Sequence, residues 1–414
     1  MAPSTLKGKK IIVGVTGCIA AYKSALLVRL LISQGAEVRV VMTPSACHFI
    51  TPLTLSTLSN NPVVVNMFPE TEGKNLDMQT WHIEYATWAD LAIIAPATVN
   101  TIAKITHGFA DNALTSVVLA LRSPLIVVPA ADVDMYTNPV TQENIEQLKN
   151  RGIYVIEPET GFLASGLNGI GRMADVNKIV DAAELVLAGF KRDLIGKKIL
   201  VTAGPTYEDI DPVRFIGNRS SGKMGYSIAK AAYLRGAKVT LISGPTSENC
   251  YPEIDIVKIR SAAQMKNEVE KHLIDNDALI MAAAVADYKP AKYSKSKIKK
   301  EQNLKSISLS ATDDILAAIN SKNSPLSGKK KVIVGFALES EDELKNAEKK
   351  LMAKNLDFIV LNSLKEPGAA MESDTNKITI LYASEKKTVR RKGFPLLSKF
   401  ITANNILNEL KNYL

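Results

Sequence analysis

The chain has 414 residues, of which 46% are hydrophobic and 22% charged, which is the profile of an ordinary globular protein and excludes a disordered or fibrous one. That length predicts two or three domains, each large enough to bury a core. The net charge of +9 suits nucleic acid, a membrane surface or phosphorylated metabolites, and its sign does not choose among them. The three cysteines are scattered without a C-x-x-C pair, so neither a disulfide framework nor a zinc site is expected. Because the N-terminus lacks an apolar signal-like stretch and no window reaches membrane-spanning length, we expect a cytoplasmic protein.

Short β-branched runs alternate with longer amphipathic runs along almost the whole chain, a pattern typical of βαβ units around a mostly parallel sheet. Both halves open with Gly-Lys-Lys before a strand, at Gly8 and at Gly196, and a helix expected over 176–190 precedes the second opening. Buried strands are expected at residues 11–15, 38–42, 91–95, 125–128 and 154–156, and again at 199–202, 239–242, 279–283, 332–335 and 358–361. The sequence therefore predicts an α/β protein with two doubly wound, mostly parallel Rossmann-like domains in tandem, residues 1–190 and 191–414.

The first expected strand is followed by a turn of small residues, Gly14-Val15-Thr16-Gly17-Cys18-Ile19-Ala20, that enters a helix. Free backbone N–H groups at such a turn can hold a phosphate. The third glycine of a dinucleotide fingerprint is missing and no acidic residue ends the second strand, so a mononucleotide fits better than NAD. An ordinary tight turn of a doubly wound domain is the alternative, and the spacing does not separate the two.

Two further segments of the first half carry polar groups. Ala97, Thr98 and Asn100 lie where a strand ends, at the edge where open α/β sheets bind ligands. His82 lies in a helix whose aromatic residues, at helical spacing, are expected to pack against the core. That histidine is either a proton carrier or a side chain that is only hydrogen-bonded.

The second half contains G-x-x-x-x-G-K at residues 217–223, but Met224 follows in place of the hydroxyl residue that binds Mg²⁺, so a true P-loop is not expected. Ser220-Ser221-Gly222 still precede a helix start, which favours an anion. Asp287 follows a buried strand, and the lysine-rich segment 289–305 after it is expected to be an exposed loop. This loop is either a solvated face or, together with Asp287, a clamp for a metal-bound triphosphate.

Nearly the whole chain resembles one family, the bifunctional phosphopantothenoylcysteine decarboxylase / phosphopantothenate–cysteine ligases, whose first half belongs to the homo-oligomeric flavin-containing cysteine decarboxylases. In the first half the resemblance rests on residues 15–23, His82-Ile83-Glu84, Ala95-Pro96-Ala97-Thr98, Asn138-Pro139 and 169–173. It implies FMN, which oxidises the cysteinyl thiol to a thioaldehyde so that CO2 can leave and then returns hydride, and it implies that His82 is catalytic. The positions that match the family's FMN contacts are Gly17, Cys18, Ile19, Ala20, Thr43, Ser45, Ala97, Thr98 and Asn100.

Two positions of the first half depart from the usual family pattern. Asp132 stands where the family usually has asparagine, so an acid replaces an amide that can donate to the substrate carboxylate. Ser165 stands where the family usually has the cysteine proposed to protonate the enethiol intermediate, and a hydroxyl is a far weaker acid. We expect both residues to act in the catalytic site, with the last reductive step the one most affected.

In the second half the resemblance rests on Ala203-Gly204-Pro205-Thr206, Asp211-Pro212-Val213-Arg214, residues 218–225 and 284–288, Lys297-Ile298-Lys299-Lys300 and Gly335-Phe336-Ala337. It implies that the substrate carboxylate attacks the α-phosphate of a nucleotide and that the cysteine amine then displaces that nucleotide. Arg214 and Asn218 would hold the acyl intermediate, and Lys297 would stabilise developing charge. Nucleotide binding maps to Asp287, Lys297, Asp313, Asp314, Ile315, Phe336, Lys350 and Lys354. The fused bacterial type uses CTP, with Mg²⁺, whose ligands the sequence does not identify.

The sequence thus favours a cytoplasmic enzyme that makes 4′-phosphopantetheine from 4′-phosphopantothenate, cysteine and CTP. Because the FMN site of the family lies between subunits, the resemblance also implies a homo-oligomer of trimeric units, or a dodecamer built from them. Asp132 and Ser165 leave an alternative, in which only the ligase is catalytic and the first half is a flavin-binding assembly or regulatory module. Nucleic-acid binding through the basic loop is disfavoured because Tyr288 and Tyr293 are its only aromatic residues.

Overall fold

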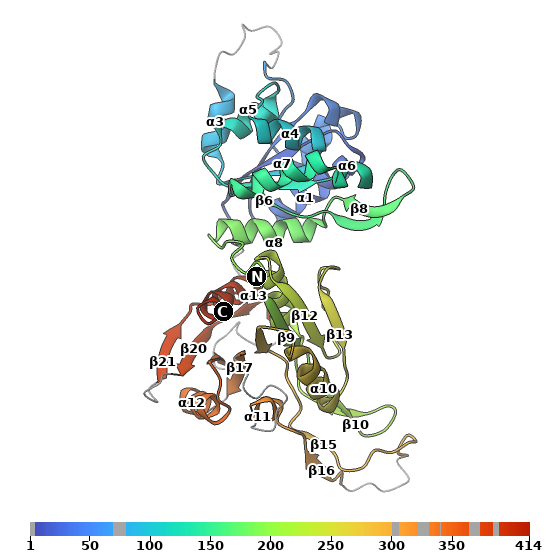
Figure 1. Cartoon of the computed structure of the whole chain (residues 1–414), viewed down its shortest axis with the longest axis vertical. Helices are drawn as coiled ribbons and strands as arrows, with labels where there is room; N and C mark the ends of the chain where they lie inside the picture. The colour runs from blue at the N-terminus through green and yellow to red at the C-terminus, as the bar shows by residue number, and fades with distance from the viewer. Residues whose placement is uncertain are drawn as a thin grey trace. The chain divides into compact units, whose positions relative to one another are not determined.

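The computed structural model describes residues 5–68, 80–299, 306–320, 331–339, 341–363, 373–383 and 389–414. The chain divides into two compact units, Ser4–Gly189 and Phe190–Leu414 (Figure 1). No helix among the described residues is both long and apolar enough to cross a membrane. Each unit is built around its own sheet.

The sheet of the first unit has six strands in the order β3-β2-β1-β4-β5-β6, and every neighbouring pair is parallel. This is the strand order of a doubly wound dinucleotide-binding domain, with its switch point between β1 and β4. The strands are β1 (Lys10–Val15), β2 (Glu37–Met42), β3 (Val63–Val64), β4 (Leu91–Ala97), β5 (Leu125–Pro129) and β6 (Tyr154–Val155). The five expected strands are confirmed, and the two-residue β3 was not anticipated.

Helices cover this sheet because its strands are apolar along their whole length. β4 is buried at every position, which is typical of a parallel strand covered on both faces. The helices are α1 (Lys23–Ser33), α2 (Pro52–Ser59), α3 (Trp81–Trp88), α4 (Val99–His107), α5 (Ala113–Ala120), α6 (Val133–Thr137), α7 (Pro139–Asn150) and α8 (Val176–Leu187), with short 3₁₀ turns η1 (Ile19–Tyr22) and η2 (Pro44–His48). As expected, Trp81, Tyr85 and Trp88 of α3 pack against the core of this unit.

One hairpin of the first unit lies outside the sheet. It consists of β7 (Glu159–Phe162) and β8 (Asn168–Arg172), which pair antiparallel. The backbone N–H of Ala131, in the segment after β5, donates to the carbonyl of Gly171 over 3.0 Å, so the hairpin is joined to that segment. Figure 1 shows the hairpin projecting from the body of the first unit.

The sheet of the second unit has eight strands in the order β13-β12-β9-β14-β17-β18-β20-β21. The first six are parallel and repeat the strand order of the first unit, whereas β20 and β21 pair antiparallel at one edge. The strands are β9 (Lys198–Ala203), β12 (Lys238–Ser243), β13 (Asp255–Lys258), β14 (Ala278–Met281), β17 (Val332–Glu339), β18 (Phe358–Ser363), β20 (Ile378–Ala383) and β21 (Val389–Gly393). The predicted pair of doubly wound sheets is confirmed, and the antiparallel edge is an addition to it.

Helices cover both faces of this second sheet. α10 (Ala262–Leu273), α11 (Ile315–Ile319) and α12 (Glu343–Ala353) contribute to one core cluster together with Leu200 of β9. α9 (Lys223–Leu234) lies on the opposite face, since Gly225 of α9 packs against Ala203, whose side chain alternates with that of Leu200 along the strand. α13 (Lys399–Lys411) packs against α9.

Three small antiparallel pairs complete the second unit. They are β10 (Tyr207–Asp209) with β11 (Phe215–Gly217), β15 (Tyr288–Pro290) with β16 (Leu309–Ala311), and β19 (Thr375–Asn376) with β22 (Leu397–Ser398). The loop expected at 289–305 is corrected at its start, because residues 288–290 form β15; residues 291–299 are mostly exposed, as expected, and residues 300–305 lie outside the described part. The helix expected over 176–190 ends earlier, at Leu187.

Candidate active sites

The first unit contains a cavity of about 850 Å³ at the carboxyl ends of β1, β4 and β5, next to the switch point between β1 and β4. Open α/β sheets bind their ligands at this place. Eight of the nine positions expected to contact FMN line it, namely Gly17, Cys18, Ile19, Ala20, Thr43, Ser45, Thr98 and Asn100. The ninth, Ala97, is the buried last residue of β4, directly before Thr98.

The turns that form this cavity are held together by one buried threonine. The Thr16 hydroxyl donates to the Pro96 carbonyl over 2.8 Å and accepts from the Thr98 N–H over 3.0 Å. Thr98 in turn caps α4 by accepting from the backbone N–H of Thr101. A Cβ atom at position 17 would lie 2.6 Å from Cβ of Ser45, so glycine is required where the turn after β1 meets η2, the turn after β2. The β1 and β4 turns therefore form one preorganised edge.

The cavity has the groups that a flavin mononucleotide requires. Hydroxyls and backbone N–H groups at the start of α4 suit a phosphate, and exposed apolar side chains, among them Ile19 and Phe162, suit a planar ring. Lys23 adds a cation whose ammonium donates to the Met173 carbonyl over 2.9 Å. Burial, and then the nearby Arg172 guanidinium, lower the pKa of Lys23. Burial raises the pKa of the Cys18 thiol, which favours its neutral form at the cavity wall.

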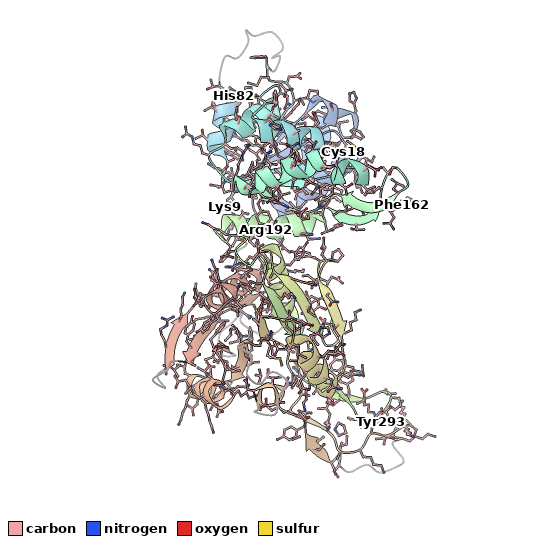
Figure 2. All side chains as sticks on the ribbon, in the orientation of Figure 1. Lys9, Cys18, His82, Phe162, Arg192 and Tyr293 are labelled. Atoms are coloured by element: carbon pink, nitrogen blue, oxygen red, sulfur yellow. The ribbon has the colours of Figure 1, made fainter. Side chains whose placement is uncertain are left out.

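The three residues expected to act on the substrate lie in different places. Asp132 lines the cavity as the residue that precedes α6, and its side chain does not cap that helix. Ser165 is in the exposed turn of the β7–β8 hairpin; its neighbour Ala164 lines the cavity and Ser165 does not. His82 is half-buried on α3, edge-to-face with Trp81, and does not line this cavity. Figure 2 shows His82 and Cys18 well apart within the unit.

Several polar side chains at this cavity were not anticipated from the sequence. They are Lys23, Lys104, Asp111, Asn112 and Arg172. Lys104 and Asp111 form an ion pair. Asn112 caps α5, and an asparagine followed three residues later by threonine, which forms a capping box here, is the one sequence signal that could have placed it.

The second unit contains a cavity of about 460 Å³ at the carboxyl ends of β14, β17 and β18. It lies beside the switch point between β9 and β14. Eight of the expected ligase residues line it, namely Asn218, Asp287, Asp313, Asp314, Ile315, Phe336, Lys350 and Lys354. Arg214 and Lys297 do not line it; both are exposed.

Asp314 anchors the wall of this cavity. Its carboxylate caps α11 by accepting from the Ala317 N–H over 3.1 Å and forms an ion pair of 2.9 Å with Lys354. Burial opposes ionisation, but these two partners lower the pKa of Asp314 below its ordinary value. Asp313, which also lines the cavity, pairs instead with Lys266 over 2.6 Å. Of the two adjacent acids, Asp314 therefore fixes the helix that carries Ile315.

The polar end of the cavity is built on the segment after β14. Asn218 donates its side-chain amide to the Val285 carbonyl over 2.8 Å, and the Ala286 N–H donates to the Thr206 hydroxyl over 2.9 Å. The Thr312 N–H donates to the backbone carbonyl of Asp287 over 2.9 Å, which connects this segment to the one that leads to α11. Asn218 and Asp287 are thereby placed on one cavity by segments far apart in sequence.

Arg214 and Lys297 lie on neighbouring segments although 83 residues separate them. The buried carboxylate of Asp211 accepts from the Arg214 N–H over 2.9 Å and from the Ile298 N–H over 3.2 Å. Burial opposes ionisation, but the backbone donors from Val213, Ile298 and Arg214 lower the pKa of Asp211. One aspartate thus fixes the arginine turn and the lysine-rich loop together.

No group of three or more histidine, cysteine, aspartate or glutamate side chains in the described ranges is arranged to hold a metal ion. The cavity of the second unit also has lining residues that were not assigned from the sequence. They include Ser220, Ser221, Gly222, Lys223, Asn362, Asn376 and Lys399.

Comparison with known proteins places this geometry in a family. The Flavoprotein family model matches residues 1–187, and the model of the DNA/pantothenate metabolism flavoprotein C-terminal domain matches residues 194–414. The coenzyme A biosynthesis bifunctional protein CoaBC of Bacillus subtilis (strain 168) is 40% identical over 407 residues, covering 98% of this chain and 97% of the relative. The chain belongs to this bifunctional coenzyme A biosynthesis family. It is an enzyme with a phosphopantothenoylcysteine decarboxylase half and a phosphopantothenate–cysteine ligase half, as the sequence predicted.

Other relatives show the same extent of likeness. The CoaBC protein of Vibrio parahaemolyticus serotype O3:K6 is 42% identical over 91% of this chain and 93% of its own length. A cysteine/cysteine sulfinic acid decarboxylase from an unknown prokaryotic organism is 45% identical over 83% of this chain and 96% of its own length. The crystal structure of a CoaBC C-terminal domain is 36% identical and covers 54% of this chain and 97% of that one, with a TM-score of 0.44. Relatives match both halves of the chain. This favours an enzyme with two activities over the alternative in which the first half only binds flavin and the ligase alone is catalytic.

Proposed function

We propose that this chain makes 4′-phosphopantetheine from 4′-phosphopantothenate and cysteine in the cytoplasm, with residues 191–414 as a CTP- and Mg²⁺-dependent ligase domain and residues 1–190 as an FMN-dependent decarboxylase domain. The observation that carries the proposal is that two separate cavities, each beside a switch point, gather most of the residues expected to bind FMN and the nucleotide. The bifunctional relatives match both halves, which supports the pairing of the two activities.

The ligase cavity suits activation of a carboxylate by a nucleotide. Phe336 supplies a face for a base and Lys350 a cation for phosphate. Asn218 offers an amide to the acyl group once the substrate carboxylate has attacked the α-phosphate and pyrophosphate has left. The cysteine amine then attacks the acyl carbon and displaces CMP. Arg214 and Lys297, which lie off the cavity, reach it by movement of their joined segments or from a second subunit.

The decarboxylase cavity suits a flavin bound against the β1 and β4 turns. When bound, FMN supplies the oxidation and the reduction that loss of CO2 from a cysteinyl group requires. Asp132 lies beside the same cavity, where its protonation state decides whether it repels or binds the substrate carboxylate. The β7–β8 hairpin, which carries Ser165, forms one wall through Phe162 and Ala164. Movement of this hairpin toward the cavity would exclude water and bring Ser165 to the substrate.

We propose that the decarboxylase site is completed in a homo-oligomer, for which the family resemblance implies trimeric units, and the position of His82 supports a site shared between subunits. His82 does not line the cavity of its own chain. Ile19, Tyr22 and Phe162 at the cavity are each more than half exposed, an apolar surface that a second copy would cover. We infer that His82 of the partner subunit enters this cavity, where it would take the catalytic role that the resemblance implies.

The test is product analysis by mass spectrometry with the purified full-length chain. The protein is incubated with FMN, Mg²⁺, 4′-phosphopantothenate, cysteine and CTP, and parallel reactions omit CTP or replace it with ATP. Appearance of 4′-phosphopantetheine only with CTP is the expected result. Accumulation of phosphopantothenoylcysteine would contradict the decarboxylase assignment, and unchanged 4′-phosphopantothenate would contradict the ligase assignment. Free cysteine and cysteine sulfinate serve as comparison substrates, because one relative carries the name of a decarboxylase of these acids.

A further inference from the structure

The ligase cavity contains a group of buried polar residues that the proposed reaction leaves without a role. This group, the lysine cluster, consists of Lys223, Asn376 and Lys399, all of which line the cavity. Lys399 is only 5% exposed and Asn376 only 3%. Lysine is almost never so buried without a specific reason. The three residues come from the first turn of α9, from β19 and from the first turn of α13.

The contacts of the lysine cluster place two ammonium groups close together. The Lys399 ammonium donates to the Ser373 carbonyl, and the Lys223 ammonium pairs with Asp374 over 2.6 Å. The side-chain amide of Asn376 contacts the Met224 sulfur over 3.3 Å, and its Oδ1 has no hydrogen-bond partner among the described residues. Because this oxygen accepts hydrogen bonds, Asn376 can bind a donor group of a ligand, such as a hydroxyl, and the ammonium groups are left to bind an anion.

The local electrostatics favour an anion. Burial, and then the charge of Lys223, lower the pKa of Lys399 to about 8, although Asp374 and Glu248 act in the opposite direction. Neither α9 nor α13 has an acidic residue in its first turn. The Ser398 hydroxyl caps α13 by accepting from the Ile401 N–H, whereas Gly222, which precedes α9, contributes no capping side chain. The N-terminus of α9 and two ammonium groups therefore act at one end of the cavity.

The lysine cluster lies across the sheet edge from two of the lysines expected to hold the nucleotide. Lys350 of α12 and Lys354, which directly follows α12, lie on the face of α10 and α11, whereas Phe336 of β17 alternates with Ala337 of that face and points to the other one. The lysine cluster belongs to the face of α9 and α13. The cavity thus runs over the carboxyl ends of the strands from one face to the other, beside the β9–β14 switch point where phosphates bind in doubly wound folds.

We propose that the lysine cluster is a phosphate subsite of the ligase cavity, in which Lys399 and Lys223 pair with phosphate oxygens and the Oδ1 of Asn376 accepts from a hydroxyl of the same ligand. The inference rests on the proposed ligase function. Two ligands of that reaction carry phosphate of the required chemistry. The nucleotide carries it in its terminal phosphates, and 4′-phosphopantothenate carries it in its single phosphate. Both carry charge that a pair of ammonium groups neutralises, and both must be fixed while the carboxylate attacks the α-phosphate.

The test is calorimetric titration of the full-length chain with pyrophosphate, CTP, CMP and 4′-phosphopantothenate in turn, for the natural sequence and for Lys399→Met. The matched control is Lys331→Met, because the Lys331 ammonium also donates to backbone carbonyls but lies outside the cavity. A charge-assisted hydrogen bond lost from a buried site weakens binding roughly 10- to 100-fold. We expect that loss in Lys399→Met and none in Lys331→Met. Lys223→Met, at a more exposed position, repeats the test if Lys399→Met does not fold.

The pattern of losses identifies which phosphate the subsite holds. Weaker binding of pyrophosphate and CTP with unchanged CMP assigns it to the nucleotide tail, whereas weaker binding of 4′-phosphopantothenate alone assigns it to the substrate. Unchanged affinity for all four ligands in both lysine variants overturns the inference. If the natural chain binds pyrophosphate but not CTP, the proposed CTP reaction fails while the subsite stands.

A pH series gives a second readout that a merely structural lysine would not move. The charged form of Lys399 binds phosphate, so affinity is fullest below a pH of about 8 and falls as the pH rises past it. Lys223, Asp374 and Glu248 are the charged groups that act on Lys399. The natural chain should therefore lose affinity for the assigned ligand between about pH 7 and pH 9, roughly one unit either side of that pKa, and Lys399→Met should not. A flat profile for the natural chain contradicts the inference.

Discussion

Ser165 lies in the turn of the β7–β8 hairpin, next to a residue that lines the flavin cavity. Its hydroxyl replaces the thiol usual in the family, and a thiol is a much stronger acid. We expect Ser165→Cys to raise the rate of 4′-phosphopantetheine formation from phosphopantothenoylcysteine by roughly tenfold or more, since a positioned acid contributes about 10²–10⁴. Stopped-flow measurement of flavin reoxidation isolates the step. If Ser165→Cys and Ser165→Ala both match the natural chain, the proton comes from another group.

Lys297 lies on the exposed loop that Asp211 joins to the turn of Arg214. If its ammonium stabilises charge in the transition state, Lys297→Gln slows formation of the acyl-cytidylate about 10²- to 10³-fold. Release of pyrophosphate in the absence of cysteine measures that first step. Lys295→Gln, two residues earlier on the same exposed loop, is the control and should keep the natural rate. If Lys297→Gln keeps the natural rate, Lys297 has no role in the transition state and is only a solvent-exposed side chain of the loop.

At the scale of elements, the segment that enters the second unit depends on a buried ion pair. Arg235, which follows α9, is fully buried; it pairs with Asp193 over 2.8 Å and donates to the Asn404 carbonyl of α13 over 3.0 Å. Asp193 also pairs with Lys411 over 2.8 Å. Asp193→Asn leaves the buried guanidinium without its counter-charge, so we expect a loss of roughly 3 kcal/mol in the free energy of unfolding of the second unit.

The measurement for Asp193→Asn is urea unfolding followed by circular dichroism, with separate transitions fitted for the two units. Lys411→Met is the control, because it removes only the exposed partner of Asp193 and should cost less than about 1 kcal/mol. Equal stability of Asp193→Asn and the natural chain would mean that the hydrogen bond from Arg235 to Asn404 alone suffices for the buried guanidinium.

The central strands could be predicted from the sequence because burial on both faces makes them continuous apolar runs. β4 and β9 are examples. Once these strands are located, the turns that follow them can be placed at the carboxyl edge of the sheet. The hairpin β7–β8 could not be predicted, since its strands are largely exposed and interrupted by glycine, as in residues 168–172. The edge strand β21 is likewise mostly exposed and basic.

The candidate sites could be predicted only where neighbouring residues in sequence stay neighbours in space. Gly17 to Ala20 and Asp313 to Ile315 each line one cavity as a block. The lysine cluster joins α9, β19 and α13, and no local pattern reveals that these elements meet. For His82 the sequence predicts a role that the fold of one chain does not explain. The resemblance assigns it to the decarboxylase site, yet it does not line that cavity in its own chain.

At the scale of the whole molecule, a decarboxylase site shared between subunits can be tested by mixing two inactive variants. We expect His82→Asn and Asp132→Ala each to abolish CO2 release, because the first lacks the histidine and the second alters the cavity. Co-expressed, they should recover roughly a quarter of the natural rate, since about one cavity in four then pairs an intact lining with an intact histidine. Carbon dioxide release is measured on the mixed and the separately purified proteins.

Two outcomes of the mixing experiment would contradict the shared site. Mixtures no more active than the separate variants would place His82 within its own chain or outside the reaction. Full activity of His82→Asn alone would leave that histidine as a packing residue against Trp81. Flavin absorbance of each variant shows in every case whether the cofactor is still bound.

The pairing of α9 with α13 has a consequence for how the second unit acquires its structure. These helices are separated by more than 160 residues of chain, and contacts at such separation form late because the loop between them must first close. The sheet from β9 to β18 can assemble before α13 docks, so a refolding intermediate would have a buried core and a nucleotide wall while the opposite end of the cavity stayed open. During refolding, ligase activity should then return later than secondary structure. The docking of α13 would be the step that limits the recovery of activity.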